Sequence, residues 1–137
     1  MAEAEYPDDS SIPDSADLWR RIPPQHIVPD ENLGRLRPSS AAFENHPNGS
    51  PMSVLLADIV QQTGRGPDDV LRGHPGFLLA AVTAGLARRC RQSVARDPLL
   101  EEPAHALVVG AKTDSARKRL ARESVWVVAP SGAPDVR

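Results

Sequence analysis

The sequence predicts a small single-domain α+β protein with a mixed sheet, two to four helices and a flexible acidic N-terminal tail. An apolar run, a capped basic helix and a second apolar run follow one another between Pro103 and Val128. The length of 137 residues suits one domain. Fourteen prolines and nine glycines indicate many loops. We therefore expect a domain at 17–130, flanked by flexible segments at 1–16 and 131–137.

The stretch from Pro103 to Val128 predicts a strand, a helix and a strand. Residues 105–109 are apolar on nearly both faces, which is typical of a buried strand. Thr113 or Asp114 can cap the helix that follows, which should run to about Glu123. The spacing fits a parallel crossover through the helix, with an antiparallel return as the alternative.

Shorter signals define the rest of the domain. Residues 18–22 predict a strand or a short helical turn that the next two prolines end, and 26–28 a second extended piece. The stretch Asp30–Pro51 has no clear period and predicts a long loop, held on the core by Ala41–Phe43.

Further along, Ser53 can cap a helix from Val54 to about Gln62. A short helix is expected from Pro67 to Arg72. The apolar run Phe77–Ala87 fits a helix or a buried strand; we favour a strand to about Thr83, followed by a basic helical turn. Residues 93–102 should be a connection.

Composition and charge limit the compartment and the partners. Cys90 is the only cysteine, so no intramolecular disulfide can form and a reducing compartment is expected. The longest mostly apolar stretch without charge, Gly76–Ala87, is too short to span a bilayer. The first 17 residues carry a charge of −6 and the remainder +4, which is mild for a nucleic-acid module. The composition is typical of a high-GC bacterium, and we expect a cytoplasmic protein.

His105 and a loop rich in arginine and serine are the candidate chemical groups. An imidazole on an apolar strand is either a general base or ligand contact, or a hydrogen-bonded core histidine. Four loop residues could bind an anion, with Ser39 as a possible catalytic hydroxyl: Arg35, Arg37, Ser39 and Ser40. The alternative is a surface turn in which the serines bond to nearby backbone.

Lys112 and Thr113 stand between the expected strand and helix, where a helix N-terminus attracts anions. The segment is not a P-loop, because Ala106 and Ala111 occupy the positions that require glycine. The histidines show no metal-ligand spacing, and no cofactor is expected.

Several short segments follow one another along the chain: LWRRIPP, RLRPSSAAF, MSVLLA, HPGF, DP and PAHALVVG. In this order the chain resembles a group of small uncharacterised bacterial proteins. The resemblance covers about 17–130; it implies a single domain, favours a strand at 77–83 and implies no mechanism.

Three hypotheses of function follow. The first is an accessory or interaction protein that acts through a protein partner, because no catalytic motif is present. The second is an enzyme or binder of an anionic small molecule, phosphate-like or nucleotide-like, that uses the arginine-serine loop and His105. The third is weak nucleic-acid binding through the basic helix at 112–122. Whether the protein is an enzyme stays open.

Overall fold

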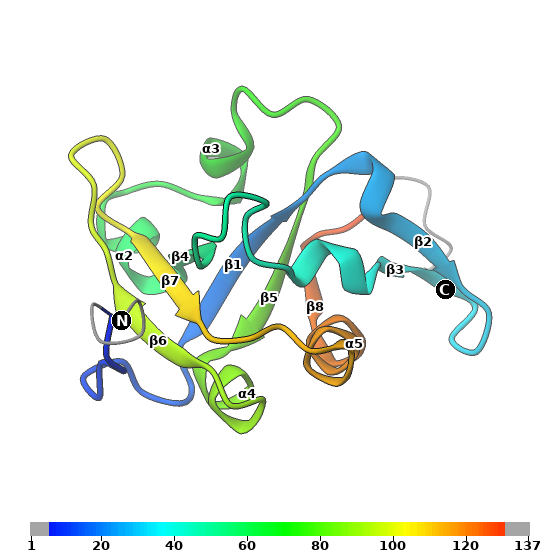
Figure 1. Ribbon diagram of the computed structural model, residues 1–137. Coiled ribbons are helices and arrows are strands. Elements are labelled where there is room, and N and C mark those ends of the chain that lie inside the picture. Colours follow the sequence, from blue (N-terminus) through cyan, green and yellow to red (C-terminus); the bar gives the residue numbers. More distant parts are fainter. Residues whose placement is uncertain (1–5, 131–137) are drawn as a thin grey trace.

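The structure, a computed structural model, describes residues 6–130 and forms a single α+β domain (Figure 1). Of the flexible segments expected at 1–16 and 131–137, residues 1–5 and 131–137 lie outside the described residues. The elements in chain order are β1 (Asp17–Ile22), η1 (Pro24–His26), β2 (Ile27–Asp30), β3 (Arg35–Pro38), η2 (Ser40–Phe43), β4 (Met52–Leu56), α2 (Ala57–Gln62), α3 (Pro67–Leu71), β5 (Leu78–Thr83), α4 (Ala84–Arg89), β6 (Ser93–Arg96), β7 (His105–Val109), α5 (Asp114–Glu123) and β8 (Val125–Val128), where η marks a 3₁₀ helix.

The predicted sheet has six strands in the order β6-β7-β4-β1-β5-β8, and every neighbouring pair is antiparallel. The predicted strand, helix and strand at the C-terminal end are β7, α5 and β8. Because four antiparallel pairings separate β7 from β8, the two strands run in the same direction. They are not neighbours, however, since β4, β1 and β5 lie between them. The crossover through α5 therefore carries the chain from one side of the sheet to the opposite edge (Figure 1).

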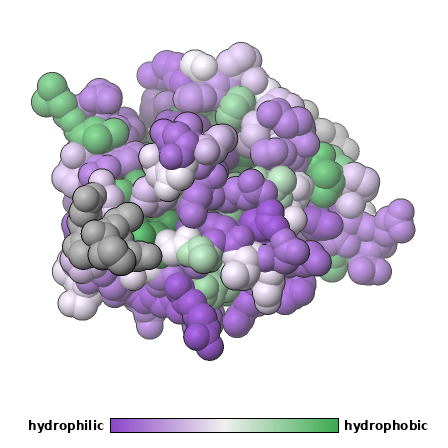
Figure 2. Space-filling view, in the orientation of Figure 1, coloured by the Kyte–Doolittle hydropathy of each residue, from purple (hydrophilic) through white to green (hydrophobic). Residues whose placement is uncertain are grey.

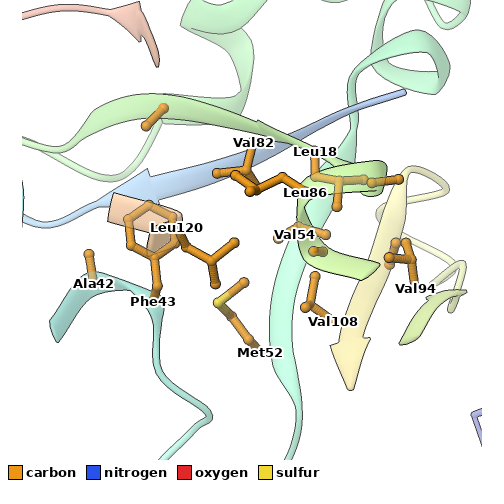
Figure 3. Packing of buried hydrophobic residues seen from close by; sticks show 14 of the residues in the cluster. Leu18, Ala42, Phe43, Met52, Val54, Val82, Leu86, Val94, Val108 and Leu120 are labelled. Atoms are coloured by element: carbon orange, nitrogen blue, oxygen red, sulfur yellow. The ribbon is translucent and has the colours of Figure 1, made fainter. Parts of the chain in front are cut away.

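Both faces of this sheet are covered, which gives two cores. The larger core joins Leu18, Val54, Val82 and Val108 from four strands to side chains of α4, α5 and η2 (Figure 3). On the opposite face, Trp19 and its strand neighbours pack on α2 and α3. Successive residues of a strand point to opposite faces, so each central strand contributes to both cores.

The prediction of a helix from Val54 was wrong at its start, because residues up to Leu56 belong to strand β4. Its residues pair with β7 on one side and with β1 on the other. Val54 and Leu56 enter the larger core, while Leu55 enters the second. Burial on both faces thus outweighs the helical spacing of these side chains, and α2 begins only at Ala57.

β5 confirms the strand expected in the run 77–87, and the helical turn follows as α4. Four residues of β5 are buried, as expected for a central strand. The Thr83 hydroxyl accepts a hydrogen bond from the backbone N–H of Leu86 and caps α4. A strand and a helix therefore share one apolar run, divided at Thr83.

Two stretches expected as loops contain regular structure. β6 occupies Ser93–Arg96 and pairs with β7, although 93–102 was expected to be a connection. The stretch Asp30–Pro51 contains β3, which forms a hairpin with β2, and η2. The expected anchor is confirmed, since Phe43 is fully buried.

The domain also begins earlier than residue 17. Ile12 is buried in the larger core, so the expected tail is ordered at least from this part onward. Arg88 on α4 holds the segment through ion pairs of 3.0 Å with Asp8 and 2.7 Å with Asp14. Two of the acidic residues that suggested disorder, Asp8 and Asp14, are therefore partners of Arg88 on α4.

Candidate functional site

The predicted site residues divide into three groups. Arg35, Arg37, Ser39 and Ser40 lie on β3 and at η2, whereas His105 begins β7 in the main sheet. Lys112 and Thr113 precede α5, as expected. The imidazole of His105 makes its polar contacts with Ser53 and Asp97, and not with the arginine-serine loop.

Arg37 and Ser40 line one hollow, together with Asp30, Lys118 and Arg122, of about 270 Å³. We call it the Arg37 hollow. Arg37 is paired, because its Nε lies 3.2 Å from a carboxylate oxygen of Asp30. Lys118 and Arg122, the other two cations of this wall, are exposed to solvent.

Ser39 and Arg35 do not line this hollow, unlike Arg37 and Ser40. Ser39 is the N-cap of η2, and its hydroxyl accepts a hydrogen bond from the backbone N–H of Ala41 at 2.9 Å. That contact matches the structural alternative for the serine. Arg35 is exposed and lines a neighbouring hollow that extends to Trp126.

Lys112 and Thr113 have partners within the protein. The ammonium of Lys112 donates to Asn45 Oδ1 at 2.7 Å and to the carbonyls of Val108 and Gly110 at 2.9 and 3.0 Å. An ammonium has three N–H donors, so no donor is left for a ligand. The Thr113 hydroxyl caps α5 by accepting from the Ala116 N–H.

A second hollow, of about 230 Å³, lies where β1 and β4 separate. The two strands are paired at Leu18–Leu56 and Trp19–Leu55, and the registered pairing stops before Ser53. We call it the Arg20 hollow, after the arginine in its wall. It is lined by Arg20, His26, Ala41, Glu44, Asn45, His46, Pro47, Pro51, Met52 and Ser53.

Arg20 follows the strand alternation and lies on the same face as the buried residues Leu18 and Ile22. Its Nε donates to the Ala42 carbonyl at 3.0 Å, and Nη1 donates to the Ser53 carbonyl at 2.8 Å. A guanidinium carries five N–H donors, so three have no acceptor among residues 6–130.

The charge of Arg20 is not balanced by a carboxylate within 4 Å in the described part of the chain. Burial of the guanidinium lowers the pKa of Arg20 to about 10, with a further contribution from Arg21. Glu44, in the same wall, has its own partner, because its Oε2 accepts a hydrogen bond of 2.6 Å from Arg117. The hollow therefore has an unpaired positive charge.

Lys112 is a second cation close to the hollow, although it does not line it. Burial, and then repulsion from Arg20, lowers the pKa of Lys112 to about 8. Asn45 connects the ammonium to the hollow, since it accepts from Lys112 and lines the wall. Two cations thus lie near each other without a neutralising acid, which raises the positive potential in the hollow.

Two histidines supply further polar groups. The Nδ1 atom of His26 is buried and has no hydrogen-bond partner among the described residues. Such a nitrogen destabilises the protein unless a ligand or water satisfies it. Nδ1 of His46 accepts a hydrogen bond from the Asn48 backbone N–H, so the proton of neutral His46 is on Nε2, which can donate.

Comparisons of the chain with protein-family models, with curated proteins and with solved structures give no match. No helix within residues 6–130 is long and apolar enough to cross a bilayer. In the same range, no three side chains of His, Cys, Asp or Glu form a group that could hold a metal ion. The geometry of the Arg20 hollow therefore carries the functional argument.

Sequence reasoning missed Arg20, His26 and Ser53, although one signal for Arg20 was present. In the segment LWRRI, Arg20 alternates with Leu18 and Ile22, so assigning a strand places a charge on a buried face. No comparable signal marks His26 or Ser53, because they join the hollow from segments distant in the chain.

Proposed function

We propose that the protein binds a small anionic molecule in the Arg20 hollow. The unpaired and partly desolvated guanidinium of Arg20 is the observation that carries this proposal. A planar guanidinium with free N–H donors suits the oxygens of a phosphate, sulfate or carboxylate group. An anion would supply the counter-charge that the described residues do not.

The remaining wall supports an oxyanion rather than a cation. His46 presents an N–H donor, and His26 presents an unpartnered ring nitrogen that can donate when protonated. The volume of about 230 Å³ leaves space for an oxyanion with a small organic substituent. The ligand class agrees with the second hypothesis from the sequence, but the residues that bind it are different.

Binding of inorganic sulfate, measured by isothermal titration calorimetry, tests the proposal. Hydrogen bonds to charged groups contribute about 1.5–3 kcal/mol. Arg20→Gln should therefore weaken sulfate binding by about 10- to 100-fold. Arg20→Lys, which keeps the charge and loses the planar fork, should give an intermediate affinity.

Arg37→Gln is the matched control, because it removes an arginine from the neighbouring hollow. It should leave sulfate affinity within about twofold, since Arg37 is paired with Asp30. Circular dichroism and thermal unfolding verify that each variant is folded. Equal affinities of the wild-type protein and folded Arg20→Gln would contradict the proposal.

A role that depends on a protein partner stays a prediction. Leu99 and Leu100, in the loop between β6 and β7, are exposed, and Leu100 completely so. Figure 2 shows hydrophobic atoms protruding at that corner of an otherwise largely hydrophilic face. This apolar tip is the described feature best suited to contact another protein.

A further inference from the structure

Ser53, His105 and Asp97 form a chain of hydrogen bonds across β4, β7 and the end of β6. Nε2 of His105 lies 3.1 Å from the Ser53 hydroxyl. Nδ1 lies 3.1 Å from a carboxylate oxygen of Asp97 and 3.0 Å from the Asp97 backbone carbonyl. Ser53 is exposed and His105 is partly buried, so the hydroxyl is accessible while the imidazole is held.

The backbone carbonyl determines the tautomer of His105. A carbonyl oxygen can only accept a hydrogen bond, so Nδ1 must carry a proton. In neutral His105, Nε2 is then an acceptor, and the Ser53 hydroxyl donates to it. This is the proton arrangement that a general base needs in order to remove the hydroxyl proton.

The surrounding backbone fixes these groups. The Asp97 N–H donates to the His105 carbonyl at 3.0 Å, which ties the two residues at the end of the β6–β7 pairing. β4 and β7 are paired in the register Ser53↔Leu107 and Leu55↔His105. The three side chains therefore lie on rigid, hydrogen-bonded neighbours and need little reorganisation.

We propose that Ser53 is a nucleophile of the serine-hydrolase type, with His105 as its general base, acting on small carboxylic esters. Asp97 is a positioning residue that orients the imidazole and stabilises its protonated form. Ser53 also lines the Arg20 hollow, but the proposed reaction uses its hydroxyl and no group of Arg20, so it does not require anion binding.

In the first step, the Ser53 oxygen bonds to the ester carbonyl carbon and its proton passes to Nε2 of His105. Collapse of the tetrahedral intermediate breaks the bond to the alcohol oxygen, which takes the proton from His105 and leaves as the alcohol. Water then attacks the acyl-Ser53 ester, again with His105 as base, and releases the carboxylic acid and free Ser53. Water is the co-reactant, and no oxidation occurs.

A fluorophosphonate probe tests the nucleophile directly. The Ser53 oxygen would form a bond to phosphorus and release fluoride. The full-length protein is labelled and then digested, and mass spectrometry of the peptides should locate the adduct on Ser53. Absence of an adduct, or an adduct on another residue, would overturn the proposal without any variant.

Variants then test the role of His105, with hydrolysis of p-nitrophenyl acetate as the second readout. General acid-base catalysis typically contributes about 10²- to 10⁴-fold. We expect Ser53→Ala and His105→Gln to lower kcat/KM by about 100-fold or more. Ser50→Ala, at an exposed serine three positions earlier, should leave it unchanged. If the fluorophosphonate probe labels folded His105→Gln at the wild-type rate, His105 does not activate Ser53, and the proposal is overturned.

Asp97→Asn separates positioning from simple structural support. The backbone carbonyl of residue 97 still accepts from Nδ1, so the tautomer is retained and the loss of kcat/KM should be smaller than for His105→Gln. Without the carboxylate, the imidazole is oriented less firmly in the transition state, so kcat should fall while KM for p-nitrophenyl acetate stays unchanged. A kcat equal to that of the wild-type protein would remove Asp97 from the mechanism.

Discussion

The Arg20 and Arg37 hollows lie beside the same 3₁₀ helix, η2, and differ in how their arginines are neutralised. Ala41 lines the first and Ser40 the second. Arg37 has the Asp30 carboxylate at 3.2 Å, whereas the described contacts of Arg20 are with carbonyl oxygens. The arginine on the buried strand face, Arg20, is thus desolvated and has no carboxylate within 4 Å among the described residues, whereas Lys118 and Arg122 of the Arg37 hollow are exposed to solvent.

The largest effect is expected from removing the support that both hollows share. Phe43 ends η2 and is fully buried in the larger core (Figure 3). Phe43→Ala should lower the free energy of unfolding by about 3–5 kcal/mol, because it deletes a buried ring and leaves a cavity. Urea denaturation measures the change.

Leu100→Ala is the control for Phe43→Ala, because Leu100 is fully exposed. It should change stability by less than about 0.5 kcal/mol. Similar losses in the two variants would show that η2 is not held by its core contact.

The comparison can be sharpened by removing the counter-charge of Arg37. Asp30→Asn deletes the carboxylate, yet an asparagine oxygen can still accept from the backbone N–H groups of Asn32 and Leu33. Freeing Arg37 should raise sulfate affinity at the Arg37 hollow by about fivefold, which corresponds to about 1 kcal/mol. Calorimetry would detect this as a second, weaker binding event, and its absence would show that an ion pair is not what separates the two hollows.

The smallest effect is the contribution of Lys112 to the pH dependence of stability. The pKa of Lys112 is about 8 in the folded protein, compared with an ordinary value of 10.5. Above pH 8 the folded protein releases a proton that the unfolded chain retains, so stability rises with pH. Between pH 7 and 9.5, wild-type stability should therefore rise relative to Lys112→Met. Subtracting the stability of Lys112→Met from that of the wild-type protein at each pH removes the contributions of other titrating groups. Cys90 is one of them, and its raised pKa lowers stability as the pH rises. Parallel curves for the two proteins would contradict the desolvation of Lys112.

The sequence predicted those elements whose local and tertiary preferences agree. β7, α5 and β8 have consistent periodicity and caps, and β5 carries an apolar run that suits a central strand. β4 was predicted as a helix because Leu55 and Ile59 have helical spacing, but pairing with two strands decides its conformation. β6 is short and includes an exposed Arg96, so it becomes a strand through its pairing with β7.

The candidate sites were less predictable than the fold, because folding assembles them from separated segments. His105 was identified as a base or a bonded core histidine, but its partners lie 52 positions away at Ser53 and 8 positions away at Asp97. Arg20, His26 and His46 line one hollow, which lies where the registered pairing of β1 with β4 has ended. Such proximity depends on strand order and register, which sequence periodicity does not determine.

The measurement that tests the central claim most directly is a sulfate titration followed through the side-chain Nε–Hε resonance of Arg20 by NMR. If the Arg20 hollow binds the anion, this resonance and the backbone amide of Ser53 should shift in a saturable way with one common Kd, while the Nε–Hε resonance of Arg37 stays in place. If Arg20 does not respond, or if Arg37 shifts with the same Kd in its place, the assignment of the anion site to the Arg20 hollow is wrong.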